Sequence, residues 1–355
     1  MGPEDIRYFR EHLMSWYREN HRPLPWRLTH NPYFIWISEV MLQQTQVKTV
    51  IPYYHRFLER FPTVATLARA DLQEVLKVWE GLGYYARARN LHQAAKMVQE
   101  QYGGRIPGEV KEFRKLPGVG EYIASAVQSI AFNQRYPVVD GNVKRLLARL
   151  FEMDAPTNGS ASLKIFRKVS AELLDPQSPA IFNQAIMELG ATVCRPQTPC
   201  CHCCPVQSLC LAYQAQKVDE YPKRIPTRPT LTHHLAVGIV SKGQRLLITR
   251  RKTDGLLGGL WEFPGGAVAK NEGSEAACVR KIKEETNLSV EIASYVTRVR
   301  HAYTHFKVIL DVFRCRYISG KVRLNHATNY RWIRVVEIDR YPFPKANHKF
   351  ISLLE

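Results

Sequence analysis

Apolar residues in the first half of the chain recur mostly at helical spacing. The stretches that begin at Ile35 and Ile123 follow this spacing, and Gly and Pro residues separate such stretches from one another. The alternation of apolar and polar positions that marks a half-buried strand is nearly absent there. Residues 1–216 therefore predict an all-α domain of roughly ten helices.

The pattern changes after residue 216. Residues 217–231 contain three prolines and no apolar periodicity, which predicts an extended, semi-rigid connector. Short β-branched or aromatic runs between turn residues then predict strands, at residues 235–240, 245–249 and 306–313. One helix is expected over residues 274–286, so residues 232–355 predict an α+β domain.

Composition narrows the class of partner. Lys and Arg number 50 against 32 Asp and Glu, a formal net charge of +18 at pH 7, and such an excess favours a polyanion, above all nucleic acid. No apolar run approaches the roughly 18 residues that a membrane-spanning helix needs. The first residues carry acids where a signal peptide carries bases, and Ile6 breaks the myristoylation pattern. We expect a monomeric cytoplasmic protein without a membrane partner.

Six of the eight cysteines lie between Cys194 and Cys210, and such clustering indicates a metal site rather than disulfides. A C-x6-C-x2-C-x5-C loop is formed by Cys194, Cys201, Cys204 and Cys210. Four thiolates at this spacing could hold an iron–sulfur cluster, and tetrahedral zinc is the alternative, although zinc sites usually use two C-x2-C pairs. A second ligand choice has workable spacing too, namely Cys194, Cys200, Cys203 and Cys210.

A glycine turn at Gly118, Val119 and Gly120 separates a short predicted helix from a longer one. Glycine lets the main chain approach an anion, and a helix N-terminus favours phosphate, so this hairpin predicts a DNA-backbone clamp without sequence readout. Asp140 follows in an apolar segment, directly before a helix expected over residues 143–150. It could cap that helix, stabilise an oxocarbenium-like sugar as a carboxylate, or do both.

Glu39 is a lone charge among large apolar side chains in residues 33–47. Burial raises the pKa of a carboxyl group, and a carboxyl with a pKa near neutrality can be the general acid for a departing base. A purely structural hydrogen bond is the simpler alternative for this residue.

The cysteine loop and the hairpin with its later aspartate resemble the endonuclease III superfamily of helix-hairpin-helix DNA glycosylases. The resemblance implies a [4Fe-4S] cluster and selects Cys201 and Cys204 over their neighbours as ligands. Bifunctional members carry a lysine two residues after the second hairpin glycine, as the amine that forms a Schiff base with the sugar. Tyr122 occupies that position here, so a monofunctional glycosylase is implied.

The segment from Glu39 to Thr45 is similar to that of MutY-type adenine DNA glycosylases, and this resemblance covers nearly the whole chain. It implies that Glu39 and Asp140 are catalytic, with Tyr122 and Asn142 as their partners. Residues around the flipped adenine are implied to be Trp26, Arg27 and Gln184. Residues that enter the duplex or wedge beside the opposite base are implied to be Gln44, Thr45, Leu82 and Tyr84. Without the resemblance, core packing is the simpler interpretation of Trp26 and Tyr84.

Residues 266–288 resemble the Nudix box, whose acidic side chains hold Mg²⁺ over a pyrophosphate. Lys281 replaces a glutamate of that pattern and Asn287 replaces a glycine. A lysine adds positive charge where the metal site needs negative charge, so we expect a Nudix-like fold kept for recognition. Glu284 and Glu285 are then expected mainly on a solvated helix face.

In MutY proteins such a domain reads 8-oxoguanine through a hairpin that bears Phe-Ser-His. The corresponding residues are Tyr303, Thr304 and His305, which keep an aromatic body and a hydroxyl. The implied partner is double-stranded DNA with an 8-oxoguanine:adenine mispair, at the bacterial nucleoid, and the implied reaction is excision of the adenine. Three alternatives stay open: a bifunctional endonuclease III-type glycosylase and lyase, a Nudix nucleotide hydrolase, and a non-catalytic iron–sulfur DNA-binding protein.

Overall fold

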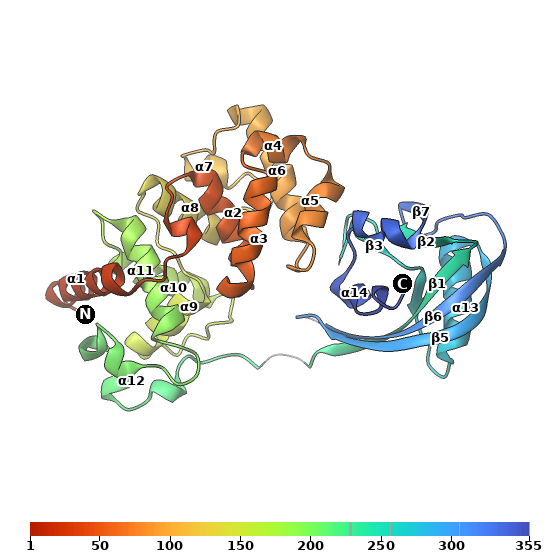
Figure 1. Cartoon of the computed structure of the whole chain (residues 1–355). Helices are drawn as coiled ribbons and strands as arrows, with labels where there is room; N and C mark the ends of the chain where they lie inside the picture. Colours follow the sequence, from red (N-terminus) through yellow and green to blue (C-terminus); the bar gives the residue numbers. More distant parts are fainter. Residues whose placement is uncertain (227–228, 256, 305, 355) are drawn as a thin grey trace. The chain divides into compact units, whose positions relative to one another are not determined.

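The computed structural model describes residues 1–226, 229–255, 257–304 and 306–354. The chain divides into two compact units (Figure 1). The first contains residues 1–68 and 93–227, and the second contains residues 69–92 and 228–355. Residues 69–92 thus group with the C-terminal half although their sequence is helical, a grouping that the sequence pattern did not indicate.

The first half of the chain is helical, as its periodicity predicts. Its α-helices are α1 (Pro3–Asn20), α2 (Pro32–Leu42), α3 (Val47–Arg60), α4 (Val64–Arg69), α5 (Leu72–Trp79), α6 (Ala86–Tyr102), α7 (Val110–Phe113), α8 (Glu121–Phe132), α9 (Gly141–Leu150), α10 (Ser162–Leu173), α11 (Pro179–Thr192) and α12 (Leu211–Gln214). Its short 3₁₀ helices are η1 (Pro25–Arg27), η2 (Cys201–Cys203), η3 (Gln207–Leu209) and η4 (Val218–Glu220). Of these, α5 and the start of α6 belong to the second unit.

Helix α11 organises the core of the first unit, because it packs against α1, α8 and α9. Helix α2 packs against α8 and is apolar around most of its circumference, so nearly all of its side chains are buried. The core that α1, α9, α10 and α11 share includes Phe9, Leu13, Val143, Leu147, Phe166, Phe182 and Leu189. Glu39, Tyr122 and Glu188 lie on α2, α8 and α11, and Asp140 directly precedes α9.

The connector is attached to the first unit over its N-terminal part. The Thr157 N–H donates to the carbonyl of Lys223 over 3.0 Å, and the Ile225 N–H donates to the side chain of Asn158 over 2.8 Å. The described residues after η4 and before residue 231 form no helix or strand. These bonds fix an extended segment that has no core of its own.

The second unit contains a mixed sheet of order β3-β2-β1-β6-β5, with β4 paired to β1 and β7 paired to β2. Strand β1 runs parallel to β6, and the other pairs are antiparallel. The strands are β1 (Leu231–Lys242), β2 (Arg245–Arg250), β3 (Trp261–Glu262), β4 (Gly265–Ala267), β5 (Ser289–Ala302), β6 (Phe306–Ser319) and β7 (Asn329–Ile333). The remaining elements are α13 (Ser274–Thr286), η5 (Val335–Arg340) and α14 (Lys345–Ile351).

Helices cover both faces of this sheet. Ala236 and Val240 of β1 pack in the same cluster as Cys278 and Ile282 of α13. Val237 and Ile239 of β1 belong to the opposite cluster, together with Phe350 of α14. Alternate residues of a strand point to opposite faces, and here both faces are buried, which explains the continuous apolar run that predicts β1. The α+β architecture expected from the sequence is thereby confirmed.

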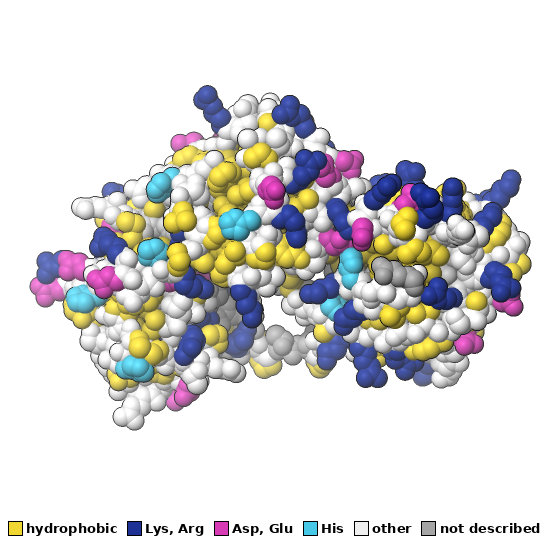
Figure 2. Space-filling view, viewed as in Figure 1, with side chains coloured by type: hydrophobic (Ala, Val, Ile, Leu, Met, Phe, Trp, Pro, Cys, Tyr) yellow, Lys and Arg dark blue, Asp and Glu magenta, His cyan; other side chains and the backbone are white. Residues whose placement is uncertain are grey.

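Basic side chains are prominent on the surface. On the visible face of the second unit, Lys and Arg side chains gather more densely than Asp and Glu side chains (Figure 2). Exposed bases on β5 and β6 include Arg300, Lys307, Arg314 and Arg316.

In the part of the chain that the structure describes, no helix combines the length and apolar character required to cross a membrane.

Candidate active site

Glu39 is a buried acid on α2. The side chain of Asn31 caps this helix by accepting from the Tyr33 N–H over 3.0 Å, and Pro32 occupies its first turn. Glu39 is 4% exposed, and the hydroxyl of Tyr122 donates to its Oε2 over 2.7 Å. Burial raises the pKa of Glu39 to about 7, while the bond from Tyr122 acts in the opposite direction. The site therefore holds a carboxyl group that exchanges a proton near neutral pH.

Asp140 is the N-cap of α9, as the sequence predicts. One carboxylate oxygen accepts from the Val143 N–H over 2.7 Å, and the other accepts from the Asn142 side-chain amide over 2.8 Å. Burial raises the pKa of Asp140, and both donors act in the opposite direction. They also orient the carboxylate, so capping the helix and presenting a fixed charge are compatible in one residue.

Tyr122 joins the two acids into one site. Burial raises the pKa of Tyr122 well above its ordinary value, and the charges of both Glu39 and Asp140 add to this effect. The charge of Asp140 also contributes to the raised pKa of Glu39. Two acids from distant parts of the sequence thus lie in one electrostatic environment, with the tyrosine in contact with Glu39.

Arg145 holds the side chain of Asn142 in place, a role that the sequence did not indicate. Its guanidinium donates to Asn142 Oδ1 over 2.9 Å, and to the carbonyls of Gly190 and Cys194 over 2.7 Å and 2.8 Å. Gly190 permits this close packing, because a Cβ at that position would lie 2.8 Å from the Cβ of Asn142. The cysteine loop, α11 and the Asp140 cap are therefore connected through one side chain.

Two of the three residues expected around the adenine, Arg27 and Gln184, both contact Tyr17. The Arg27 guanidinium lies 5.4 Å from the centre of the Tyr17 ring, and the Tyr17 hydroxyl donates to Gln184 Oε1 over 3.2 Å. Trp26 is buried and meets the Tyr54 ring edge-on, with 5.4 Å between the ring centres. The charge of Arg27 also acts on Glu39, so this group adjoins the two acids.

Glu188 was missed by sequence reasoning although it carries the same signal as Glu39, a lone acid in an apolar helix. Its side chain is fully buried and accepts from the Arg22 N–H over 3.0 Å, from the Arg22 guanidinium over 2.7 Å and 2.6 Å, and from the Arg27 guanidinium over 2.7 Å. Burial alone would raise the pKa of Glu188, but these hydrogen bonds outweigh it and lower the pKa to about 2. Glu188 therefore fixes Arg27 as a permanently charged ion pair.

The hairpin has the expected form. Gly118 has a φ of +77°, in the region that favours glycine, and Gly120 precedes the first turn of α8. Val119 is buried. Because Tyr122 lies in that first turn, the helix whose N-terminal N–H groups favour phosphate also carries the partner of Glu39.

Gln44 and Thr45 directly follow the helix of Glu39. Gln44 has a φ of +55°, and the Thr45 N–H donates to the carbonyl of Leu42 over 3.2 Å. A non-glycine residue in this region costs conformational energy, and such residues concentrate at functional sites. The structure thus places both residues in a sharp turn between α2 and α3.

Two of the residues expected at the base opposite the adenine lie together in the second unit. The Tyr84 hydroxyl donates to Thr304 Oγ1, and Tyr84 has a φ of +50°. Tyr303 stacks on Phe306 with 4.6 Å between ring centres. Leu82 is buried. His305 lies outside the described residues.

Four thiols of the cysteine loop lie near enough to act on one another electrostatically, namely Cys194, Cys201, Cys204 and Cys210. The thiols of Cys194, Cys201 and Cys210 all act electrostatically on Cys204, and the thiols of Cys194 and Cys201 act on Cys210. Arg149 donates to the Cys194 sulfur over 3.3 Å. This arrangement favours the C-x6-C-x2-C-x5-C set over the alternative with Cys200 and Cys203.

The spacing of these four thiols also bears on the metal that they fit. Zn–S bonds of about 2.3 Å place all the sulfurs of a zinc site within roughly 4.6 Å of one another. Among the described residues, the one group of three or more ligand atoms within 4.8 Å of one another is Cys200, His202 and Cys203. The four thiols of the C-x6-C-x2-C-x5-C set do not form such a group among the described residues.

Two acids of the Nudix-like segment, Glu272 and Glu284, are held in ion pairs. Arg280 donates to Glu272 over 2.7 Å and 2.6 Å and to Glu284 over 2.9 Å, and Lys281 donates to Glu284 over 2.7 Å. Both Glu284 oxygens are thus engaged by cations. Asn287 replaces the glycine at the end of α13 and adopts the same left-handed conformation, with a φ of +62°. Lys281 occupies the place where a metal ion would need a further carboxylate.

Comparison with known proteins first gives the class. One family model, described as HhH-GPD superfamily base excision DNA repair protein, matches residues 37–171, and a NUDIX domain model matches residues 236–353. A thermostable thymine-DNA glycosylase is similar with a TM-score of 0.55 and 28% identity, over 60% of this chain and 98% of that one. A trapped endonuclease III–DNA covalent intermediate is similar with a TM-score of 0.53 and 25% identity, over 61% and 99%. The fold is thus that of a helix-hairpin-helix base excision repair protein with an added NUDIX domain.

Relatives of known function then identify the particular family within this class. The adenine DNA glycosylase of Rattus norvegicus is 37% identical over 364 aligned positions, which cover 87% of this chain and 70% of that protein. The human adenine DNA glycosylase is 34% identical, with 87% and 67% covered. That of Buchnera aphidicola subsp. Acyrthosiphon pisum is 32% identical, with 90% of each chain covered. The chain belongs to the adenine DNA glycosylase family.

Proposed function

We propose that this adenine DNA glycosylase removes adenine paired with 8-oxoguanine or guanine in double-stranded DNA. It hydrolyses the N-glycosidic bond and leaves the strand intact. The observation that carries the proposal is the buried Glu39–Tyr122 pair with Asp140 in the same site. Glu39 provides a proton for the base and Asp140 provides a negative charge near the sugar. None of the three side chains is an amine.

Glu39 acts as the general acid. A pKa of about 7 leaves a large protonated fraction at neutral pH. The carboxyl group donates its proton to a ring nitrogen of adenine, so that the base departs neutral while the C1′–N bond breaks. The resulting carboxylate then accepts a proton from the attacking water.

Asp140 stabilises the sugar. Bond breakage leaves positive charge on the ring oxygen and C1′, and a carboxylate fixed by two N–H donors can stabilise that charge or bond to C1′. Arg145 holds Asn142 in place, so the carboxylate requires little reorganisation during the reaction. Arg27, Gln184 and Trp26 would surround the adenine.

The monofunctional reaction follows from the side chain at position 122. A lyase of this superfamily needs an amine that forms a Schiff base with C1′ of the sugar. Tyr122 offers a phenol, which burial and two nearby acids keep protonated. A protonated phenol can orient Glu39 but cannot form an imine.

The base opposite the adenine is read by the second unit. The Tyr84–Thr304 pair combines an aromatic face with a hydroxyl that can donate and accept, and Tyr303 is held beside it by stacking on Phe306. His305 follows Thr304 in the sequence. The basic surface of this unit supports binding to the phosphates of duplex DNA. We expect a monomeric chain that acts at the bacterial nucleoid.

The cysteine loop would hold a [4Fe-4S] cluster through Cys194, Cys201, Cys204 and Cys210. When bound, the cluster would cross-link the segments of the loop that carry these four thiols. Through Arg149 and Arg145, the loop is connected to α9 and so to the Asp140 cap. The cluster's contribution is therefore structural.

Glu39→Gln tests the proposal. We expect this variant to bind an 8-oxoguanine:adenine duplex with unchanged affinity and to excise no adenine, as measured by strand scission of a labelled duplex after alkali. Glu112→Gln, a surface acid, is the matched control and should remain active. Full activity of Glu39→Gln would remove its role, and strand breaks before alkali treatment would contradict the monofunctional reaction.

A further inference from the structure

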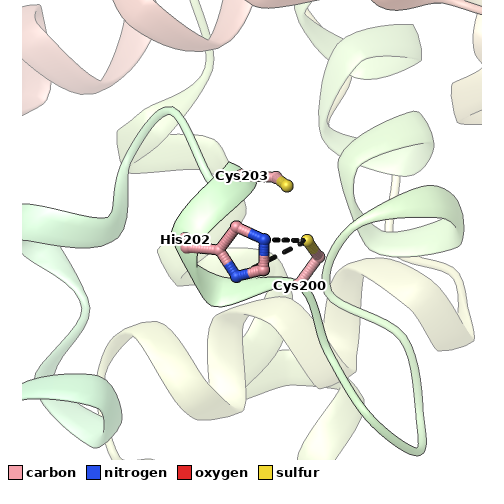
Figure 3. Close-up of side chains that lie close together, drawn as sticks. All are labelled: Cys200, His202 and Cys203. Atoms are coloured by element: carbon pink, nitrogen blue, oxygen red, sulfur yellow. Dashed lines mark hydrogen bonds between the residues drawn. The ribbon is translucent and has the colours of Figure 1, made fainter.

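Two thiols of the cysteine loop remain outside the four-thiol set. Cys200 and Cys203 lie with His202 so that their ligand atoms are within 4.8 Å of one another. The Cys200 sulfur is 3.3 Å from Nε2 of His202 (Figure 3). Cys200 is half-buried, and His202 and Cys203 are exposed to solvent.

The local backbone explains why the loop has two groups. Residues three apart lie on the same side of a 3₁₀ helix, and residues one apart are turned by about a third of a circle. The Cys203 N–H donates to the Cys200 carbonyl, and the Cys204 N–H donates to the Cys201 carbonyl, both over 3.1 Å. Two C-x2-C pairs are therefore interleaved with an offset of one residue, and they face different directions.

The two pairs also have different surroundings. The Cys194 thiol accepts from the Arg149 guanidinium and the Cys210 thiol donates to the Arg149 carbonyl, whereas the Cys200 thiol lies against His202. One pair completes a four-thiol set. The other pair, Cys200 and Cys203, lies beside the imidazole of His202 at the surface.

We propose that Cys200, His202 and Cys203 form a second metal site, separate from the cluster site, for a thiophilic divalent ion such as Zn²⁺. Two thiolates and one imidazole suit this ion, and a spacing below 4.8 Å fits Zn–S bonds of about 2.3 Å and Zn–N bonds of about 2.0 Å. Binding releases both thiol protons to solvent and gives a neutral site. The fourth tetrahedral position faces solvent and takes water or a donor atom from another molecule.

The test uses the full chain with its cluster. The protein is incubated with zinc and freed of unbound metal, and zinc and iron are then measured per chain. We expect about one zinc per chain in the wild type and none in Cys200→Ser/Cys203→Ser, with equal iron in both. His202→Ala should retain less zinc than His12→Ala, which removes an exposed histidine elsewhere. Cobalt in place of zinc should give the visible absorption of thiolate-bound tetrahedral cobalt in the wild type only.

A second measurement tests the proposal on the wild type alone, in case the double variant does not fold. Zinc should protect Cys200 and Cys203 of the wild type from alkylation, as located by mass spectrometry. Equal zinc in the wild type and the double variant would overturn the proposal. A loss of iron in a folded double variant would also overturn it, because these thiols would then be cluster ligands. A Cys200–Cys203 disulfide that persists in the presence of zinc would overturn it as well. Adenine excision, measured in parallel, reports separately on the glycosylase proposal.

Discussion

Replacing Tyr122 with Phe removes one hydroxyl from the candidate site and little else. That hydroxyl donates to Glu39 Oε2 over 2.7 Å and favours the ionised carboxylate. A hydrogen bond to a charged group contributes about 1.5–3 kcal/mol, and about 1.4 kcal/mol corresponds to one pH unit. Tyr122→Phe should therefore raise the pKa of Glu39 from about 7 by roughly one to two pH units.

Single-turnover excision measures this effect as a function of pH. Since protonated Glu39 is the acid, the rate in the wild type should fall as the pH rises through about 7. In Tyr122→Phe this decline should begin at higher pH by roughly one unit or more. Tyr102→Phe is the matched control, because it removes a Tyr–Glu hydrogen bond of 2.9 Å at the surface.

Three results would contradict this prediction. An unchanged pH profile in Tyr122→Phe would show that the hydroxyl does not set the pKa of the catalytic group. A shift of the decline to lower pH would show that the hydroxyl favours the protonated carboxyl instead. Equal shifts in Tyr122→Phe and Tyr102→Phe would assign the effect to general destabilisation.

Three further perturbations test other parts of the structure. Glu188→Gln should lower the free energy of unfolding by about 3 kcal/mol at neutral pH, measured by denaturant titration, because it leaves buried arginine charge unpaired. Because the pKa of Glu188 is lowered to about 2, the stabilisation by its ion pairs is present above the unfolded pKa of about 4.3 and is lost as the pH falls towards 2. If Glu188→Gln lowered the free energy of unfolding equally at low and neutral pH, this reasoning would be wrong. Gly190→Ala should cost about 1–3 kcal/mol and slow excision, since the added Cβ would lie 2.8 Å from that of Asn142; full stability and rate would show that the helices separate freely. Tyr84→Phe and Thr304→Val should each reduce the preference for 8-oxoguanine:adenine over guanine:adenine duplexes in binding assays, and the double variant should lose little more than either single variant; additive losses would show that the two residues act independently.

Features that depend on neighbouring residues were predictable from the sequence. Asp140 caps α9 because its side chain reaches an N–H three residues away, and α13 spans the residues that its periodicity predicts. The runs that predict β1, β2 and β6 lie within those strands, whereas β5 was missed because few of its side chains are buried. A lone charge in an apolar helix correctly indicated that Glu39 is buried.

The sequence by itself determined the helices, the apolar strands, the basic character and the two candidate acids, because each follows from short-range spacing or from composition. Only the tertiary structure decided which groups meet. It paired Glu39 with Tyr122, revealed the Glu188 ion pairs, separated the interleaved cysteines and grouped residues 69–92 with the second unit. The physical reason is that pKa values, metal spacing and ion pairs depend on distances of a few ångströms between residues that are far apart along the chain.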